Sequence, residues 1–174
     1  MKIDLVAETA LTTVDDRAIA DLIAASFNTD FGGRSFYKQR HHLRILAYDN
    51  GLIGHMALCL RAIRLGRDLV DIAGLAEVCT HPAHRGKGVA TKMLETAISA
   101  ADATLAEYLV LFGDAPLYAA NGFVRQSNKM TFAVMDDAWT RGLKTDTDDG
   151  LMVLPLRQSA WPRSAALDLL GPVF

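Results

Sequence analysis

The segment between residues 81 and 88 combines glycines with cationic side chains, and this combination suits a negatively charged ligand. It joins a strand-like apolar run to a helical pattern. Gly86 and Gly88 let the backbone come close to a ligand, and the first N–H groups of the following helix have no partner inside the helix. The helix dipole also favours an anion there. Arg85 and Lys87 add positive charge, although solvated loop charge is the alternative interpretation of both side chains. We therefore predict a pyrophosphate-binding loop.

Hydrophobic patterns around this loop predict the elements that position it. Asn50-Gly51 lies between two apolar runs and is typical of a tight hairpin turn. The strand before the loop, the helix after it and the next apolar run predict a right-handed crossover with two parallel strands. The expected elements are strands at 1–8, 43–48, 52–58, 70–80, 108–112, 129–134 and 151–155, helices at 14–27, 89–101 and 114–120, a helical turn at 36–40 and a polar link at 144–150.

Composition narrows the class of protein. The length of 174 residues predicts a single domain over 1–174. A net charge of −2 and a pI near 6.2 argue against a nucleic-acid partner, because nonspecific binding needs a basic face. No apolar window approaches the roughly 20 residues that span a bilayer, so we expect a cytoplasmic protein without a membrane partner. Cys59 and Cys79 lie in apolar runs, as buried cysteines of a reducing compartment would. The scattered histidines predict no metal site.

Two motifs resemble one enzyme family. The segment from Arg85 to Ala90 fits the Arg/Gln-x-x-Gly-x-Gly/Ala signature and resembles motif A of the GNAT superfamily of N-acetyltransferases. The segment from Leu117 to Phe123 is similar to the Leu-Tyr-x-x-x-Gly-Phe of the same family, although Leu111 stands where the family often has Asn. The resemblance implies an α/β GNAT fold, with a mixed, mostly antiparallel central sheet flanked by helices and a parallel strand pair around the loop. It also implies acetyl-CoA as cosubstrate.

The resemblance implies which residues contact acetyl-CoA. In the family, the strand before the loop separates from its neighbour, so that backbone N–H groups face the thioester and the pantetheine. The loop and the helix start then contact the phosphates. Carried over to this chain, the predicted contacts are Val78, Cys79, Thr80, Arg85, Gly86, Lys87, Gly88, Val89 and Ala90.

Acetyl transfer to an amine needs a base, an oxyanion donor and a general acid. The amine must lose a proton, the intermediate carries an oxyanion, and the leaving thiolate gains a proton. The family match assigns the oxyanion to the backbone of Val78 and the general acid to Tyr118, for which packing is the alternative. Glu77 is the candidate base, unless it faces solvent or a salt bridge. The C-terminal carboxylate of Phe174 is a substrate-binding candidate, and a frayed terminus is the alternative.

The predicted function is acetyl-CoA-dependent acetylation of a primary amine of a small molecule by direct attack. Two segments are similar to NodA-type N-acyltransferases, residues 47–56 and the tail at 153–155, 161–162 and 171–172. Residues 148–155 and the aromatic C-terminal residue are similar to aminoglycoside 2'-N-acetyltransferases, and a shared structural tail is the alternative explanation. Both likenesses favour an amino sugar or aminoglycoside as acceptor. A longer acyl donor and a noncatalytic acyl-CoA-binding or sensing module are the alternatives, and a homodimer is compatible with the resemblance. The sequence does not determine the acceptor, because substrate loops vary on a shared scaffold.

Overall fold

A computed structural model describes residues 1–113, 116–136 and 138–174. The chain forms two compact units, which comprise residues 1–59 with 76–100 (unit 1) and residues 60–75 with 101–174 (unit 2). The strands β3 (Leu52–Leu65) and β4 (Asp68–Thr80) supply residues to both units. No helix within the described ranges is long and apolar enough to cross a membrane.

Unit 1 contains an antiparallel meander. β1 (Lys2–Ala7) is followed by the short 3-10 helix η1 (Glu8–Ala10) and pairs with β2 (Leu43–Tyr48), which in turn pairs with β3. Asn50 and Gly51 connect β2 to β3 with φ of 56° and 140°, conformations that glycine and asparagine tolerate best. The predicted hairpin is therefore confirmed.

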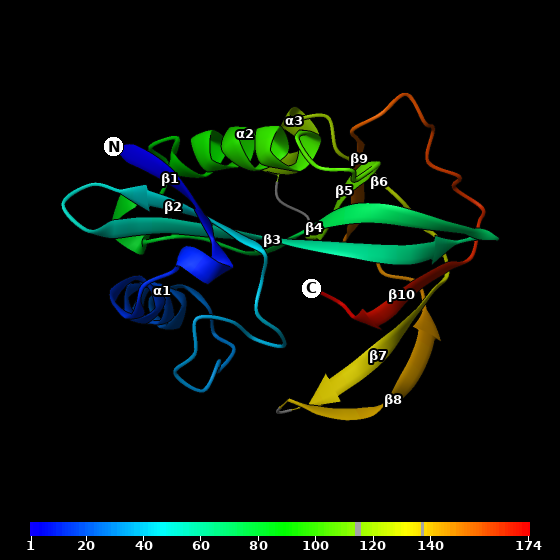
Figure 1. Cartoon of the computed structure of the whole chain (residues 1–174), viewed down its shortest axis with the longest axis horizontal. Helices are drawn as coiled ribbons and strands as arrows, with labels where there is room; N and C mark the ends of the chain where they lie inside the picture. The colour runs from blue at the N-terminus through cyan, green and yellow to red at the C-terminus, as the bar shows by residue number, and fades with distance from the viewer. Residues whose placement is uncertain (114–115, 137) are drawn as a thin grey trace. The chain divides into compact units, whose positions relative to one another are not determined.

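Two helices cover opposite faces of this meander (Figure 1). α1 (Thr13–Ser26) begins with a capping box between Thr12 and Asp15 and buries its apolar face in a cluster that includes Leu46 of β2. α2 (Val89–Asp102) packs on the other face, where a Cβ at Gly54 would lie 2.7 Å from the Met93 side chain. A glycine in β3 therefore allows α2 to approach the strand closely.

Unit 2 is a mixed sheet. Its strand order is β6 (Val124–Arg125), β9 (Leu151–Pro155), β5 (Tyr108–Phe112), β4, β3, β10 (Leu167–Pro172), β7 (Met130–Asp136) and β8 (Trp139–Asp146). β5 runs parallel to β4, as predicted, and β10 runs parallel to β7. The short helix α3 (Pro116–Ala120) follows β5. The expected mixed sheet, flanking helices and parallel pair are confirmed.

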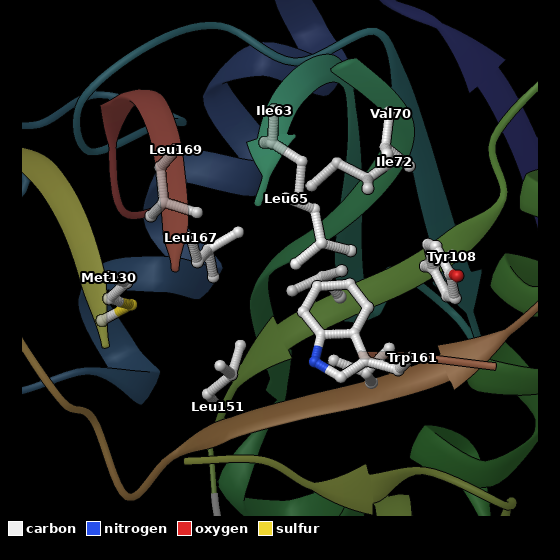
Figure 2. Close-up of a cluster of buried hydrophobic side chains, with 12 residues drawn as sticks. Ile63, Leu65, Val70, Ile72, Tyr108, Met130, Leu151, Trp161, Leu167 and Leu169 are labelled. Carbon is white, nitrogen blue, oxygen red and sulfur yellow. The ribbon is translucent and has the colours of Figure 1, made fainter. Parts of the chain in front are cut away.

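An aromatic pair anchors the core of unit 2 (Figure 2). The rings of Tyr108 and Trp161 meet edge to face, with 4.9 Å between their centroids. Trp161 Nε1 donates a hydrogen bond to Asn128 Oδ1 (2.8 Å), and the Asn128 amide donates to the carbonyls of Pro162 and Ala165 (3.0 and 2.8 Å). The buried polar atoms of Trp161 and Asn128 thus have partners, which connect the loop that carries Trp161 to the loop before β7.

Two local predictions were wrong. Residues 36–40 form bends rather than a helical turn, and the Tyr37 N–H donates to the Glu77 carboxylate (2.7 Å). The predicted polar link 144–150 begins inside β8, an edge strand whose exposed residues show no apolar alternation. β10 was not expected, since Gly171 and Pro172 interrupt its pattern. Asp114 and Ala115, the predicted start of α3, lie outside the described residues.

Candidate active site

The glycine loop leaves β4 through a turn that the chain itself stabilises. η2 (Pro82–His84) begins where the His81 ring accepts a hydrogen bond from the Ala83 N–H (3.3 Å), and the His81 N–H donates to the Ile53 carbonyl of β3 (2.8 Å). Gly86 and Gly88 follow with φ of 74° and 77°. Apart from its own chain neighbours, no heavy atom of the described residues lies within 4 Å of a Cβ built on either glycine, so open space adjoins the backbone there.

Two cations border this space. Arg85 Nε donates to the Thr80 carbonyl (3.2 Å), and Lys87 Nζ donates to the Ala83 carbonyl (2.9 Å). Both side chains are exposed, and the helix α2 starts at once after the loop. The predicted loop residues therefore lie together, with exposed cations, positive-φ glycines and a helix N-terminus in one place.

The end of β4 is irregular. Glu77 has a φ of 51°, in the left-handed region that costs a non-glycine residue roughly 1–2 kcal/mol. Beyond it, Val78 and Thr80 are half-buried, whereas the Cys79 side chain is buried in the α1 cluster. Burial raises the pKa of the Cys79 thiol to about 12, so this thiol stays protonated at neutral pH. The Cys79 side chain is therefore not exposed to a ligand, and the predicted acetyl-CoA contact of its backbone stays a prediction.

The Glu77 carboxylate points inward, and its side chain is 8% exposed. Oε1 accepts a hydrogen bond from the Tyr37 N–H (2.7 Å), and Oε2 lies 2.9 Å from His41 Nε2 and 3.6 Å from Arg44 Nη1. The His41 contact is an ion pair without hydrogen-bond alignment. The structure thus shows a salt bridge, which was one of the alternatives to the base role of Glu77. The base role itself stays a prediction.

His41 is the second member of this buried network. Its Nδ1 lies 2.9 Å from Cys59 Sγ, and its Nε2 faces Glu77. Burial alone would lower the pKa of His41, but the contacts with Cys59 and Glu77 outweigh it and raise the pKa to about 9. The ring is therefore cationic at neutral pH.

Arg44 and His55 complete the network. Arg44 is fully buried on β2 and donates to Glu8 (2.7 and 3.2 Å), to the Ser35 carbonyl (2.8 Å) and to His55 Nε2 (3.1 Å). His55 Nδ1 lies 3.0 Å from the Glu77 carbonyl. Since a guanidinium only donates and a carbonyl only accepts, Nε2 must accept and Nδ1 must carry the proton. Burial, followed by the charges of Arg44 and His41, lowers the pKa of His55 well below its usual value.

Sequence reasoning missed His41, Arg44 and His55. A signal was present for two of them, because Arg44 and His55 stand inside the apolar runs of β2 and β3. A buried cation needs an acidic partner, and this requirement points to a polar network.

Unit 2 carries the remaining candidates, Tyr118 and Phe174. Tyr118 lies on α3, is 8% exposed and packs against Phe123 with 5.9 Å between ring centroids. The Phe174 ring lies over Gly74 of β4 and contacts Phe112, with Arg61 5.2 Å from its centroid. The Phe174 ring is therefore packed rather than frayed. The acid role of Tyr118 and the substrate role of the Phe174 carboxylate stay predictions.

Comparison with known proteins places these features in one family. The model of the acetyltransferase (GNAT) domain matches residues 33–125, more than half of the chain. No curated protein matches the chain.

Solved structures share the fold. The GNAT family N-acetyltransferase YhbS of Escherichia coli, solved in complex with CoA, is 18% identical, with a TM-score of 0.67 over 97% of this chain and 89% of that one. A GNAT family acetyltransferase of Brucella melitensis, solved with acetyl-CoA, is 17% identical (TM-score 0.59, 95% and 94% covered). The ribosomal-protein-S18-alanine N-acetyltransferase of E. coli is 15% identical (TM-score 0.61, 92% and 98% covered).

Proposed function

Because the chain belongs to the GNAT acetyltransferase family, we propose that it transfers an acetyl group from acetyl-CoA to a primary amine of a small molecule. The main support for this proposal is the geometry of the glycine loop before α2. Its exposed cations, its two positive-φ glycines and its helix N-terminus suit a pyrophosphate. The CoA and acetyl-CoA complexes of the similar structures support the same ligand.

The residues of the loop fit the phosphates of acetyl-CoA. Arg85 and Lys87 would supply charge, and the N–H groups from Gly86 to Ala90 would donate hydrogen bonds. The open space beside Gly86 and Gly88 admits a phosphate close to the backbone. Val78 and Thr80 of β4 would contact the thioester and the pantetheine through their backbone, with Cys79 between them.

The proposed chemistry is a direct transfer. The amine nitrogen attacks the thioester carbonyl and forms a tetrahedral oxyanion, for which the Val78 N–H is the proposed donor. The C–S bond then breaks, and Tyr118 protonates the departing thiolate. Glu77 is the proposed acceptor of the amine proton, reached through a water because its carboxylate is buried. An amino sugar is the narrower proposal for the acceptor.

A second candidate is a noncatalytic acyl-CoA-binding module. The burial of Glu77 against His41 and Arg44 favours it, because a carboxylate that stays in this network would serve structure alone. Such a module would need the loop from Arg85 to Ala90 and would not need Tyr118.

Thiol release from acetyl-CoA across a panel of amines distinguishes the two candidates. The panel includes aminoglycosides, glucosamine oligomers and polyamines, and it is run with the wild type and with Tyr118→Phe. We expect amine-dependent release that falls in the variant while acetyl-CoA binding persists. Tight binding of acetyl-CoA without release for any amine would support the binding module instead.

A further inference from the structure

The buried network reaches the backbone of β4 at one point, the carbonyl of Glu77. His55 Nδ1 lies 3.0 Å from this oxygen, and the ring sits on β3, opposite Leu46 of β2. The Glu77 carbonyl and the Val78 N–H belong to the same peptide unit. We infer that His55 is a positioning residue that aims the Val78 N–H at the oxyanion, an inference that rests on the proposed function.

The planarity of the peptide bond explains how a contact at the Glu77 carbonyl can orient the Val78 N–H. In a trans peptide the carbonyl and the N–H point in opposite directions, and rotation about the C–N bond is prevented by its partial double-bond character. A donor that holds the Glu77 oxygen inside unit 1 therefore turns the Val78 N–H away from the buried network. His55 thus sets the direction of a donor that it does not touch.

The conformation of Glu77 makes such a restraint necessary. Its φ of 51° is unfavourable for a residue with a Cβ, so local preference alone would not hold this peptide orientation. Three contacts hold it: the His55 ring at the carbonyl, and the Tyr37 N–H and the cation of His41 at the carboxylate. Of the three, only His55 contacts the peptide unit that carries the Val78 N–H.

The hydrogen bond also strengthens the donor. A carbonyl that accepts a hydrogen bond polarises its own peptide, and estimates of this cooperativity are roughly 10–30% per bond. Arg44 supports the arrangement, because its guanidinium donates to Nε2 and fixes the tautomer with the proton on Nδ1. Burial lowers the pKa of His55 well below its usual value, so the ring is neutral at neutral pH and its Nε2 can accept from Arg44.

Two substitutions of His55 form a matched pair. His55→Asn removes the acceptor for Arg44 but retains an N–H donor near the position of Nδ1. His55→Leu removes the same acceptor and the donor as well. A merely structural role predicts similar effects for both variants, whereas the positioning role predicts a defect confined to His55→Leu.

The readout is the carbonyl stretch of bound [1-¹³C]acetyl-CoA, measured by isotope-edited infrared spectroscopy alongside kcat and KM. We expect a shift to lower frequency in the wild type and in His55→Asn, and loss of most of this shift in His55→Leu. We expect kcat of His55→Leu to fall toward the 10²–10³-fold loss seen when an oxyanion donor is removed, with KM for acetyl-CoA little changed. An unchanged carbonyl frequency in folded His55→Leu would overturn the inference.

A measurement on the wild type covers the case in which His55→Leu does not fold. In ¹⁵N-labelled protein, the ring shifts of His55 should report a proton on Nδ1, and the Val78 amide proton should move downfield when acetyl-CoA binds. A Val78 amide that does not respond to acetyl-CoA refutes the inference. Neither spectrum requires turnover. If no amine causes thiol release, the proposed function is rejected, but the two spectra still test whether His55 positions the Val78 N–H.

Discussion

Raising the pH should remove a large stabilising contribution that depends on His41. The pKa of His41 is raised from 6.5 to about 9, because the contacts with Cys59 and Glu77 outweigh burial. The folded protein therefore binds this proton more tightly than the unfolded chain does. The resulting stability is complete below the unfolded pKa of 6.5 and is lost as the pH rises through about 9.

The size of the effect follows from the shift. About 2.5 pKa units at 1.36 kcal/mol each correspond to roughly 3 kcal/mol. Arg44 is the other cation beside Glu77 and His55 is neutral, so the paired Glu77 carboxylate is essential to the effect.

The assay is urea unfolding of the wild type and of His41→Asn at several values from about pH 6 to about pH 9.5. The variant lacks the titrating ring, and the difference between the two proteins cancels the other groups that titrate in this range. We expect the stability advantage of the wild type to shrink by roughly 3 kcal/mol across the range, and by less in a Glu77→Gln background. A constant difference between wild type and variant would refute the assigned interactions of His41.

Three further predictions concern single positions. Gly74→Ala should lower the free energy of unfolding by about 1–3 kcal/mol, because its Cβ would lie 2.8 Å from the Phe174 ring. In urea unfolding, Phe174→Leu added to this variant should recover part of the loss. Gly88→Ala should weaken acetyl-CoA binding in calorimetry, because φ at Gly88 is 77°; Gly33→Ala, with a φ of 69° and similarly open surroundings, is the control that should bind normally. Glu77→Gln should lower kcat, whereas a folded variant that keeps the kcat of the wild type would exclude Glu77 as the base.

Local patterns predicted the elements that surround the loop. Asn50-Gly51 specified a hairpin, and the glycines and cations from Arg85 to Gly88 specified a turn before a helix, because each signal lies within a few neighbouring residues. The edge strand β8 was not predicted as a strand, because its residues are exposed and show no alternation of apolar and polar residues.

The buried network could not be predicted in the same way. Glu77 meets Tyr37, His41 and His55, which lie 22 to 40 residues away in the chain. The sequence showed a carboxylate in a strand and left its direction open. Glu77 has a left-handed φ and a buried side chain, and no local residue pattern in the sequence predicts either feature.

Acetyl transfer from acetyl-CoA to an amine by direct attack is tested by following the acetyl group itself. The protein is incubated with [1-¹³C]acetyl-CoA and each amine, and the labelled carbonyl is followed by NMR while free thiol is measured in the same sample. We expect the label to appear in an amide of the amine, in amounts equal to the thiol released. Label that remains on acetyl-CoA with every amine, or that leaves only as acetate or on a protein side chain such as Cys59, would contradict it.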